Sequence, residues 1–334
     1  VLKSKKKYKK AVEIARKFGS SKIEIENLIY LEFKELFKNR NYKEAAEWGL
    51  ENKISKSEVD IVAEKAFINL IKEQRYQEAL SFFERFDLHP ERVFDNAVNA
   101  FNRCFKKRLY LLSAMYGKKF KLSEKRTLTA AALETINSIE ENNLDKIIRL
   151  EKEFNIFSDN GFSLIDNTTR EILAENFVKN LINKNFEEGK ENLVISFLEE
   201  LELLNKKITY EPLLEMLNSI YYSAAIYHNS CLKKGDVSRA KHIIEFFELL
   251  GDEVPYNVKT MVINGAIDYH NELLKKLNYN EAKKVKDNYN IQFSKLGENV
   301  GIVGASSIVF DNIFDLESSN IAGHYIIKKK ISRT

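Results

Sequence analysis

The chain has little of what marks a secreted domain or a membrane protein. Its 334 residues contain two cysteines, Cys104 and Cys231, too few for a disulfide framework, so a reducing compartment fits best. Twelve glycines and three prolines are few for this length, which favours long helices joined by short turns. No apolar run approaches the ~20 residues of a membrane span.

Charge of neither sign dominates. Lys and Arg number 53 against 49 Asp and Glu, a net charge of +4, which is too small to imply a polyanionic partner for the whole molecule. The N-terminus is basic but lacks the apolar segment of a signal peptide. We therefore expect a cytoplasmic protein without a membrane span.

One short pattern recurs eight times, and five of its copies share one constant spacing. An aromatic or leucine opens each of these five copies, and a small or apolar residue follows three positions later. The openings are Tyr8, Tyr42, Tyr76, Tyr110 and Leu144, and the followers are Ala11, Ala45, Ala79, Ser113 and Ile147. A period near 34 is typical of stacked helix pairs. The sequence predicts an all-α, right-handed superhelical solenoid of antiparallel pairs.

The best copy covers residues 57–91. Apolar residues at helical spacing between Ile61 and Ile71 predict a first helix, and the polar stretch Lys72 to Arg75 predicts a turn. A second helix is expected to start near Tyr76 and to be closed by Pro90.

This copy resembles the tetratricopeptide repeat family. Tyr76, Ala79, Phe83 and Pro90 match the family pattern of an aromatic, a small residue, a second aromatic and a closing proline, with the proline one place early. The resemblance covers roughly residues 5–155. It implies a superhelix whose first helices line an inner groove.

Two departures from the family pattern recur. The aromatic slot is taken by Gly49 and Gly117, and the small residue of the first helix is replaced by Phe33, Phe67 and Phe101. Because these phenylalanines follow the period of the repeat themselves, the departure is systematic. We expect altered packing within each hairpin.

Later copies are spaced irregularly. Openings are expected at Phe186, Val237 and Tyr279, followed by Gly189, Ala240 and Ala282. Their spacings of 42, 51 and 42 predict longer helices or extra turns. With a break at residues 160–169, the predicted organisation is regular repeats over 1–158, irregular repeats over 159–295, and a capping helix and tail over 296–334.

The last of these segments carries a second resemblance. Leu296, Gly297, Glu298, Gly304 and Ala305 resemble the C-terminal segment of the ROK family of sugar kinases and repressors. Kinase activity would need a glycine-bearing phosphate loop after a strand, and no such loop occurs. A degenerate ROK-related or enzyme-accessory protein remains an alternative.

The sequence contains no catalytic or metal motif. His228, Cys231 and His242 form the densest set of soft ligands, but they are three at irregular spacing where a structural zinc site needs four. There is no G-x-S-x-G elbow and no H-E-x-x-H motif. We expect no enzyme activity, no cofactor and no metal.

The likeness to tetratricopeptide repeats implies a binding groove on the first helices. Mapping the repeat predicts these groove residues: Asn27, Tyr30, Lys34, Lys65, Ile68, Lys72, Asn99, Asn102 and Lys106. Lys65 with Asn99 and Asn102 resembles part of a carboxylate clamp, because ammonium and amide groups donate hydrogen bonds to carboxylates. The expected function is a scaffold or adaptor that binds an extended peptide or partner helix.

Basic clusters support a different hypothesis. Six lysines lie within residues 3–10, and nine Lys or Arg against one acid lie within 103–126. The second cluster supplies a candidate nucleic-acid patch: Arg103, Lys107, Arg108, Lys118, Lys119 and Lys121. A nucleic-acid-associated regulator would bind phosphates through them with salt-sensitive affinity.

Overall fold

The computed structural model describes residues 8–288, 291–293 and 308–310. Their contacts divide the chain into two compact units. Unit 1 comprises Val1–Thr135 and Leu164–Thr169, and unit 2 comprises Ile136–Ser163 and Arg170–Thr334. Of the predicted tail at 296–334, only residues 308–310 are described. Residues 3–7 of the N-terminal basic cluster also lie outside the described residues.

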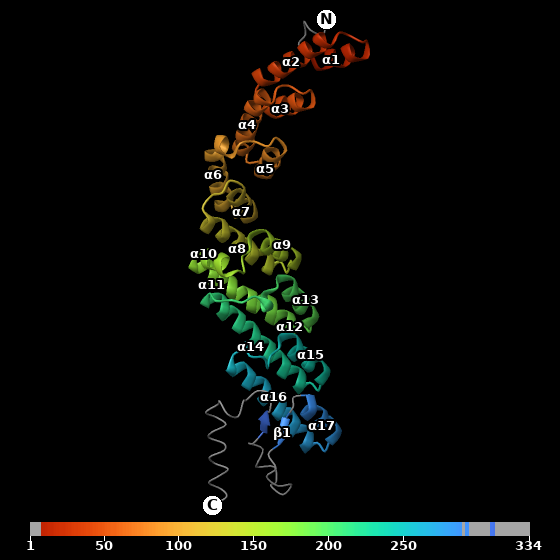
Figure 1. Ribbon diagram of the computed structural model, residues 1–334, viewed down its shortest axis with the longest axis vertical. Coiled ribbons are helices and arrows are strands. Elements are labelled where there is room, and N and C mark those ends of the chain that lie inside the picture. The colour runs from red at the N-terminus through yellow and green to blue at the C-terminus, as the bar shows by residue number, and fades with distance from the viewer. Residues whose placement is uncertain (1–7, 289–290, 294–307, 311–334) are drawn as a thin grey trace, which may run out of the picture. The chain divides into compact units, whose positions relative to one another are not determined.

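Unit 1 alternates long helices of 17 residues with short helices of 10. The helices are α1 (Tyr8–Lys17), α2 (Lys22–Lys38), α3 (Tyr42–Glu51), α4 (Lys56–Lys72), α5 (Tyr76–Arg85), α6 (Pro90–Lys106), α7 (Tyr110–Lys119) and α8 (Glu124–Glu140). Figure 1 shows α2, α4 and α6 following one another along one side, and α3, α5 and α7 along the other. The long helices start at the constant period that the repeat predicts, at Lys22, Lys56, Pro90 and Glu124.

Non-glycine residues in the left-handed conformation end most of these helices. Arg40, Gln74, Arg108 and Asn142, which follow the period of the repeat, have φ between 53° and 63°. A second series closes the short helices: Gly19, Lys53, Asp87, Lys121 and Asn155. A left-handed residue directs the last amide groups back onto free carbonyl oxygens of the helix end. The chain therefore makes tight turns with few glycines.

The core of unit 1 repeats with the same period. Phe33, Phe67 and Phe101 are buried, as are Ala45 and Ala79. The small residue lets the short helix approach the long one, and the phenylalanine fills the space beside it. The phenylalanines and alanines that recur in the sequence are therefore core residues of this unit.

Two glycines lie where the next long helix approaches a short helix. A Cβ atom at Gly49 would lie 2.7 Å from Cγ2 of Val59, and one at Gly117 would lie 2.1 Å from Oγ1 of Thr127. Both distances are far below van der Waals contact. At these two positions only glycine fits without movement of the neighbour.

Unit 2 has longer first helices and an inserted turn. Apart from residues 164–169, which belong to unit 1, it contains α9 (Leu144–Phe154), α10 (Asp159–Leu164), α11 (Asn167–Asn176), the π-helix η1 (Phe177–Asn183), α12 (Lys184–Glu187), α13 (Glu191–Leu201), the 3₁₀ helix η2 (Leu203–Asn205), α14 (Glu211–Lys233), α15 (Val237–Phe247), α16 (Tyr256–Lys275) and α17 (Tyr279–Asn288). α11, η1 and α12 follow one another without a break. Two three-residue strands, β1 (Ile291–Phe293) and β2 (Ile308–Phe310), pair antiparallel with Gln292 opposite Val309.

One predicted repeat copy in unit 2 is wrong. Phe186 lies at the end of a first helix and Gly189 in the turn after it, with φ of 70°. The second helix of this pair begins at Glu191. Asn185 imitates a helix cap in the sequence, but it is buried and donates a hydrogen bond to the carbonyl oxygen of Leu181 (2.6 Å). The openings at Val237 and Tyr279 do begin α15 and α17.

Pro90 also differs from its expected role. The second helix of the best copy ends at Arg85, and Pro90 is the first residue of the next long helix. Proline suits that position because the first amide of a helix has no partner within the helix. The proline that was expected to close one repeat copy therefore opens the next one.

The predicted all-α class and the adjacent helix pairs are confirmed. Apart from β1 and β2, each element of the described ranges is helical. Among those helices, none is both long enough and apolar enough to cross a bilayer.

Candidate functional site

A cavity of about 510 Å³ lies between α6 and α8 in unit 1. We call it the α6–α8 cavity. Its lining consists of five residues of α6 and one of α8: Asn99, Asn102, Arg103, Phe105, Lys106 and Arg126. Three of the predicted groove residues and one residue of the predicted basic patch therefore share one site. Among these six described residues, three side chains are cationic and none is acidic.

Arg126 is held in place by two contacts with α6. Its guanidinium donates a hydrogen bond to Oδ1 of Asn102 (2.6 Å) and lies over the ring of Phe101, 4.8 Å from the centroid. A guanidinium has five N–H donors, so these contacts leave most of them for a ligand. The carboxamide of Asn102 thus fixes the orientation of a cation instead of standing alone as a ligand donor.

An adjoining apolar cavity of about 250 Å³ shares Arg126 with the first. It is lined by Phe94, Val98, Phe101, Lys121, Leu122, Ser123 and Arg126. Phe94 is 42% exposed, so its ring is accessible to a ligand. The two cavities place a cationic and an apolar surface next to each other.

Contacts between consecutive long helices recur at one position of the repeat. Glu58, Arg92 and Arg126 occupy the same place in successive copies, and each lies near the start of its long helix. Their partners on the preceding long helix are the hydroxyl of Tyr30 (2.5 Å), the carboxylate of Glu64 (2.9 Å) and the carboxamide of Asn102 (2.6 Å). The sequence prediction omitted Arg126 from the site residues, and the only signal for it in the sequence is the repeat position that it shares with Glu58 and Arg92.

The earlier groove residues are placed differently. Tyr30 donates to Glu58, and this hydrogen bond raises the pKa of Tyr30 and lowers that of Glu58. Nζ of Lys34 lies 4.5 Å from the centre of the Tyr30 ring. Asn27 is exposed. All three residues lie on α2; Tyr30 contacts both Lys34 and Glu58 of α4.

The predicted clamp is only partly assembled. Asn99 and Asn102 share the α6–α8 cavity, whereas Nζ of Lys65 lies over the ring of Phe37, 4.5 Å from its centroid. Ile68 packs against the core, and Lys72 is exposed at the end of α4. Lys106 occupies the cavity in which the prediction had placed Lys65.

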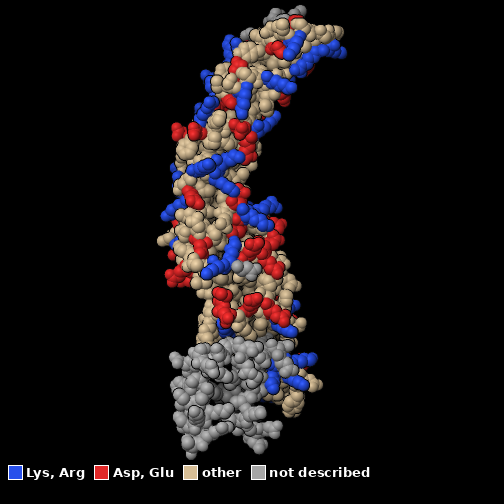
Figure 2. Space-filling model, viewed as in Figure 1, with Lys and Arg blue, Asp and Glu red and all other residues tan. Residues whose placement is uncertain are grey.

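The predicted nucleic-acid patch is divided among several surroundings. Arg103 lines the α6–α8 cavity and Lys121 the apolar cavity. Lys107 donates to the side chain of Gln74, and Lys119 pairs with Glu84 (3.0 Å). The exposed residues Arg108 and Lys118 lie at the α6–α7 turn and near the end of α7. Figure 2 shows basic and acidic side chains interspersed on the face it presents.

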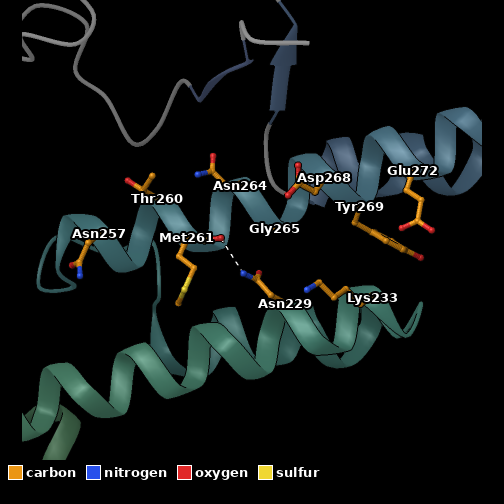
Figure 3. A pocket seen from close by; sticks show the side chains of 10 residues that line it. All are labelled: Asn229, Lys233, Asn257, Thr260, Met261, Asn264, Gly265, Asp268, Tyr269 and Glu272. Carbon is orange, nitrogen blue, oxygen red and sulfur yellow. Dashed lines mark hydrogen bonds between the residues drawn. The ribbon is translucent and has the colours of Figure 1, made fainter. Parts of the chain in front are cut away.

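Unit 2 contains a comparable cavity of about 480 Å³ between α14 and α16, the α14–α16 cavity (Figure 3). Asn229 and Lys233 come from α14. The remaining lining residues come from α16: Asn257, Thr260, Met261, Asn264, Gly265, Asp268, Tyr269 and Glu272. Three of these ten residues are asparagines, and charges of both signs are present.

Asn229 is fixed against the backbone of α16. Its Nδ2 donates to the carbonyl oxygen of Met261 (3.1 Å), and its Oδ1 lies 2.7 Å from Nδ1 of His228. Burial lowers the pKa of His228 to about 4, so the ring is neutral at pH 7. Because Oδ1 only accepts, Nδ1 of His228 carries the proton. A Cβ at Gly265 would lie 2.0 Å from this Oδ1, so the glycine is needed for the close approach.

His228, Cys231 and His242 do not form a metal site. Within the part of the chain that the structure describes, no three His, Cys, Asp or Glu side chains are placed to hold an ion. His228 and Cys231 are both buried, and His242 is exposed.

No family model, curated protein or solved structure matches the chain.

Proposed function

We propose that the protein is a non-catalytic helical-repeat scaffold that binds a segment of a partner protein between its long helices. The α6–α8 and α14–α16 cavities occupy the same place in the fold, between the first helices of consecutive pairs. Pre-formed surfaces between repeats suit the binding of extended peptides or partner helices. The likeness to tetratricopeptide repeats supports the same function.

The observation that carries the proposal is the charge of the α6–α8 cavity. Arg103, Lys106 and Arg126 line it with two asparagines and without an acid. Charge-assisted hydrogen bonds from guanidinium and ammonium groups to carboxylates are among the stronger polar interactions in proteins. The ligand is therefore an acidic peptide segment.

The adjoining apolar cavity adds a second requirement. Its volume of about 250 Å³ and its lining by Phe94, Val98 and Leu122 suit an apolar side chain of the ligand. Since Arg126 borders both cavities, the apolar residue and a carboxylate must be neighbours along the ligand. Binding sites commonly combine apolar walls with a few placed polar groups in this way.

The test is a fluorescence anisotropy titration of the full chain with a short labelled peptide rich in Asp and Glu that contains one Leu. We expect Arg103→Ala and Arg126→Ala each to weaken binding about tenfold, and salt to weaken it further. Lys283→Ala, an exposed lysine of α17, is the matched control. Equal affinity of all four proteins would contradict the proposal.

A nucleic-acid regulator is the second candidate, because the cations of the basic cluster at residues 103–126 could bind phosphates. A labelled single-stranded oligonucleotide tests it in the same assay. Binding abolished by charge reversal at Lys118, Lys119 and Lys121 would favour this candidate, whereas binding that persists would exclude the predicted patch. For the ROK-related alternative, a sugar or nucleotide should raise the melting temperature.

We expect the protein in the cytoplasm. Both cysteines are free and buried, and thiols of this kind need no oxidising compartment.

A further inference from the structure

A row of polar side chains lies along α16 at one-turn intervals. Thr260, Asn264 and Asp268 are four residues apart and line the α14–α16 cavity, and Figure 3 shows them projecting from the same side of the helix. Four residues of α-helix rise about 6 Å. Two residues of an extended chain rise about 6.7 Å and return the backbone groups to the same side. The row thus nearly matches the repeat of an extended peptide.

The hydrogen-bonding capacity of the row favours N–H donors in the ligand. The hydroxyl of Thr260 donates to the carbonyl oxygen of Tyr256 (2.9 Å), so it can only accept from a ligand. The carboxylate of Asp268 accepts as well, and the carboxamide of Asn264 both accepts and donates. A peptide strand supplies such a set through its backbone, with an N–H and a C=O at every second residue on one side.

The opposite wall adds a donor. Nδ2 of Asn229 carries two hydrogens, and one of them is bonded to the carbonyl oxygen of Met261. The other is available to a carbonyl oxygen of the ligand. Because Asn229 is also anchored to His228, this donor is held in place before the ligand binds.

The charges of this cavity do not select a strongly charged ligand. The lining contains one cation, Lys233, and two carboxylates, Asp268 and Glu272. The carboxylate of Glu272 forms a salt bridge with Lys276 (2.6 Å). The α6–α8 cavity, in contrast, is lined by three cations and no acid. The two sites therefore differ in the chemistry of what they bind.

We infer that the α14–α16 cavity is a second peptide site, which binds an uncharged extended segment through its backbone N–H groups. The inference rests on the proposed function, because the ligand is again a peptide. Recognition is expected to depend on backbone conformation more than on side chains and to be nearly insensitive to salt. A scaffold with both sites could hold two segments of different character.

The probe is obtained from a displayed library of short peptides without Asp, Glu, Lys or Arg, selected on the full chain and resynthesised with a fluorescent label. Asn264→Ala and Asp268→Ala remove acceptors from exposed positions, so the fold should be retained. Each is expected to weaken binding about three- to tenfold. Asn218→Ala, on α14 but outside the cavity lining, should leave the affinity unchanged.

N-methylation of the probe tests the backbone contact directly. Methyl groups on alternate amides should abolish binding, whereas methyl groups on the intervening amides should be tolerated. The site is excluded as a peptide site when no selected peptide depends on Asn264 and Asp268, or when methylation shows no alternation. Arg103→Ala should not affect this probe, and only the acidic probe reports on the α6–α8 cavity, so the two proposals fail separately.

Discussion

Tyr116 donates its hydroxyl hydrogen to the carbonyl oxygen of Tyr76, far earlier in the chain, over 3.0 Å. Both side chains are buried. The contact joins the short helices of two consecutive pairs, α5 and α7. The hydroxyl of Tyr76 itself is buried without a hydrogen-bond partner among the described residues. One pair of tyrosines thus contains one satisfied and one unsatisfied hydroxyl.

Removing these two hydroxyls should have different effects on stability. Tyr116→Phe loses a buried hydrogen bond and should lower the free energy of unfolding by about 1 kcal/mol. Tyr76→Phe removes a buried polar atom that gains nothing in the folded state, so it should be neutral or stabilising by up to about 1 kcal/mol. Urea unfolding followed by circular dichroism measures both. A loss in Tyr76→Phe as large as that in Tyr116→Phe would show that the Tyr76 hydroxyl has a partner.

Glycine at a left-handed helix end should stabilise unit 1. Gln74 has φ of 63°, a conformation that strains side chains with a Cβ atom. We expect Gln74→Gly to raise the free energy of unfolding by up to about 1 kcal/mol, because relief of strain exceeds the entropy gained by the unfolded chain. The side chain also accepts from Lys107, an exposed contact of little worth.

Gln77→Gly is the matched control for that substitution. Gln77 is exposed in the first turn of α5, three residues further on, where glycine should cost up to about 0.5–1 kcal/mol. The prediction is therefore a difference of sign between two identical chemical changes. If both variants lose the same stability in urea unfolding, the left-handed turn at Gln74 carries no strain.

A side chain at Gly117 should be destabilising because of one neighbour. In Gly117→Ala the new Cβ would lie 2.1 Å from Oγ1 of Thr127, and such overpacking typically costs about 1–3 kcal/mol. Thr127→Ala removes the closest atom, so the double variant should recover part of this loss. A double-mutant cycle by urea unfolding measures the coupling. Additive effects would mean that Thr127 does not limit the space at Gly117.

The sequence predicted unit 1 well because its repeat combines strict spacing with strong residue preferences. Tyr76 and Ala79 lie at the start of a short helix, and both are buried there. Packing at these two positions requires an aromatic and a small residue. The turn at Lys72 to Arg75 followed from its polarity and is observed between α4 and α5. A fixed period allowed each copy to support the others.

The repeat pattern gave a wrong prediction at one place in unit 2, where residues that fit the pattern do not begin a second helix. Asn185 and Phe186 look like a cap and an opening aromatic, but η1 and α12 extend the preceding helix through them. Short patterns do not reveal how long a helix continues, since tertiary packing decides that. Arg126 was missed as a site residue for a related reason: its role depends on Asn102 and Phe101 from another helix.

Both thiols should be unreactive in the native protein. Cys104 and Cys231 are buried, and burial raises the pKa of both, that of Cys104 to about 12. The reactive species is the thiolate, which is scarce at pH 8 for such groups. An aromatic disulfide reagent should label neither cysteine in buffer and both in denaturant. Rapid labelling of Cys104 without denaturant would show that α6 opens locally.

Acidification should destabilise unit 2 through His228. The ring is fully buried and its pKa is lowered from 6.5 to about 4 by desolvation. Between these two pH values the unfolded chain binds a proton that the folded chain does not, so stability falls as pH falls. The slope is about 1.4 kcal/mol per pH unit, and the loss ends near pH 4, where the folded form is protonated too.

Comparing His228→Gln with the wild type isolates this contribution from that of the carboxyl groups. The variant is expected to be less stable at neutral pH, because it loses the packing and the hydrogen bond to Asn229, but to lose less on acidification. The difference in unfolding free energy should therefore shrink between neutral pH and about pH 5. His242→Gln, at an exposed position, should follow the wild-type curve. Parallel curves for wild type and His228→Gln would mean that the ring takes up a proton without unfolding, and that burial does not hold it neutral.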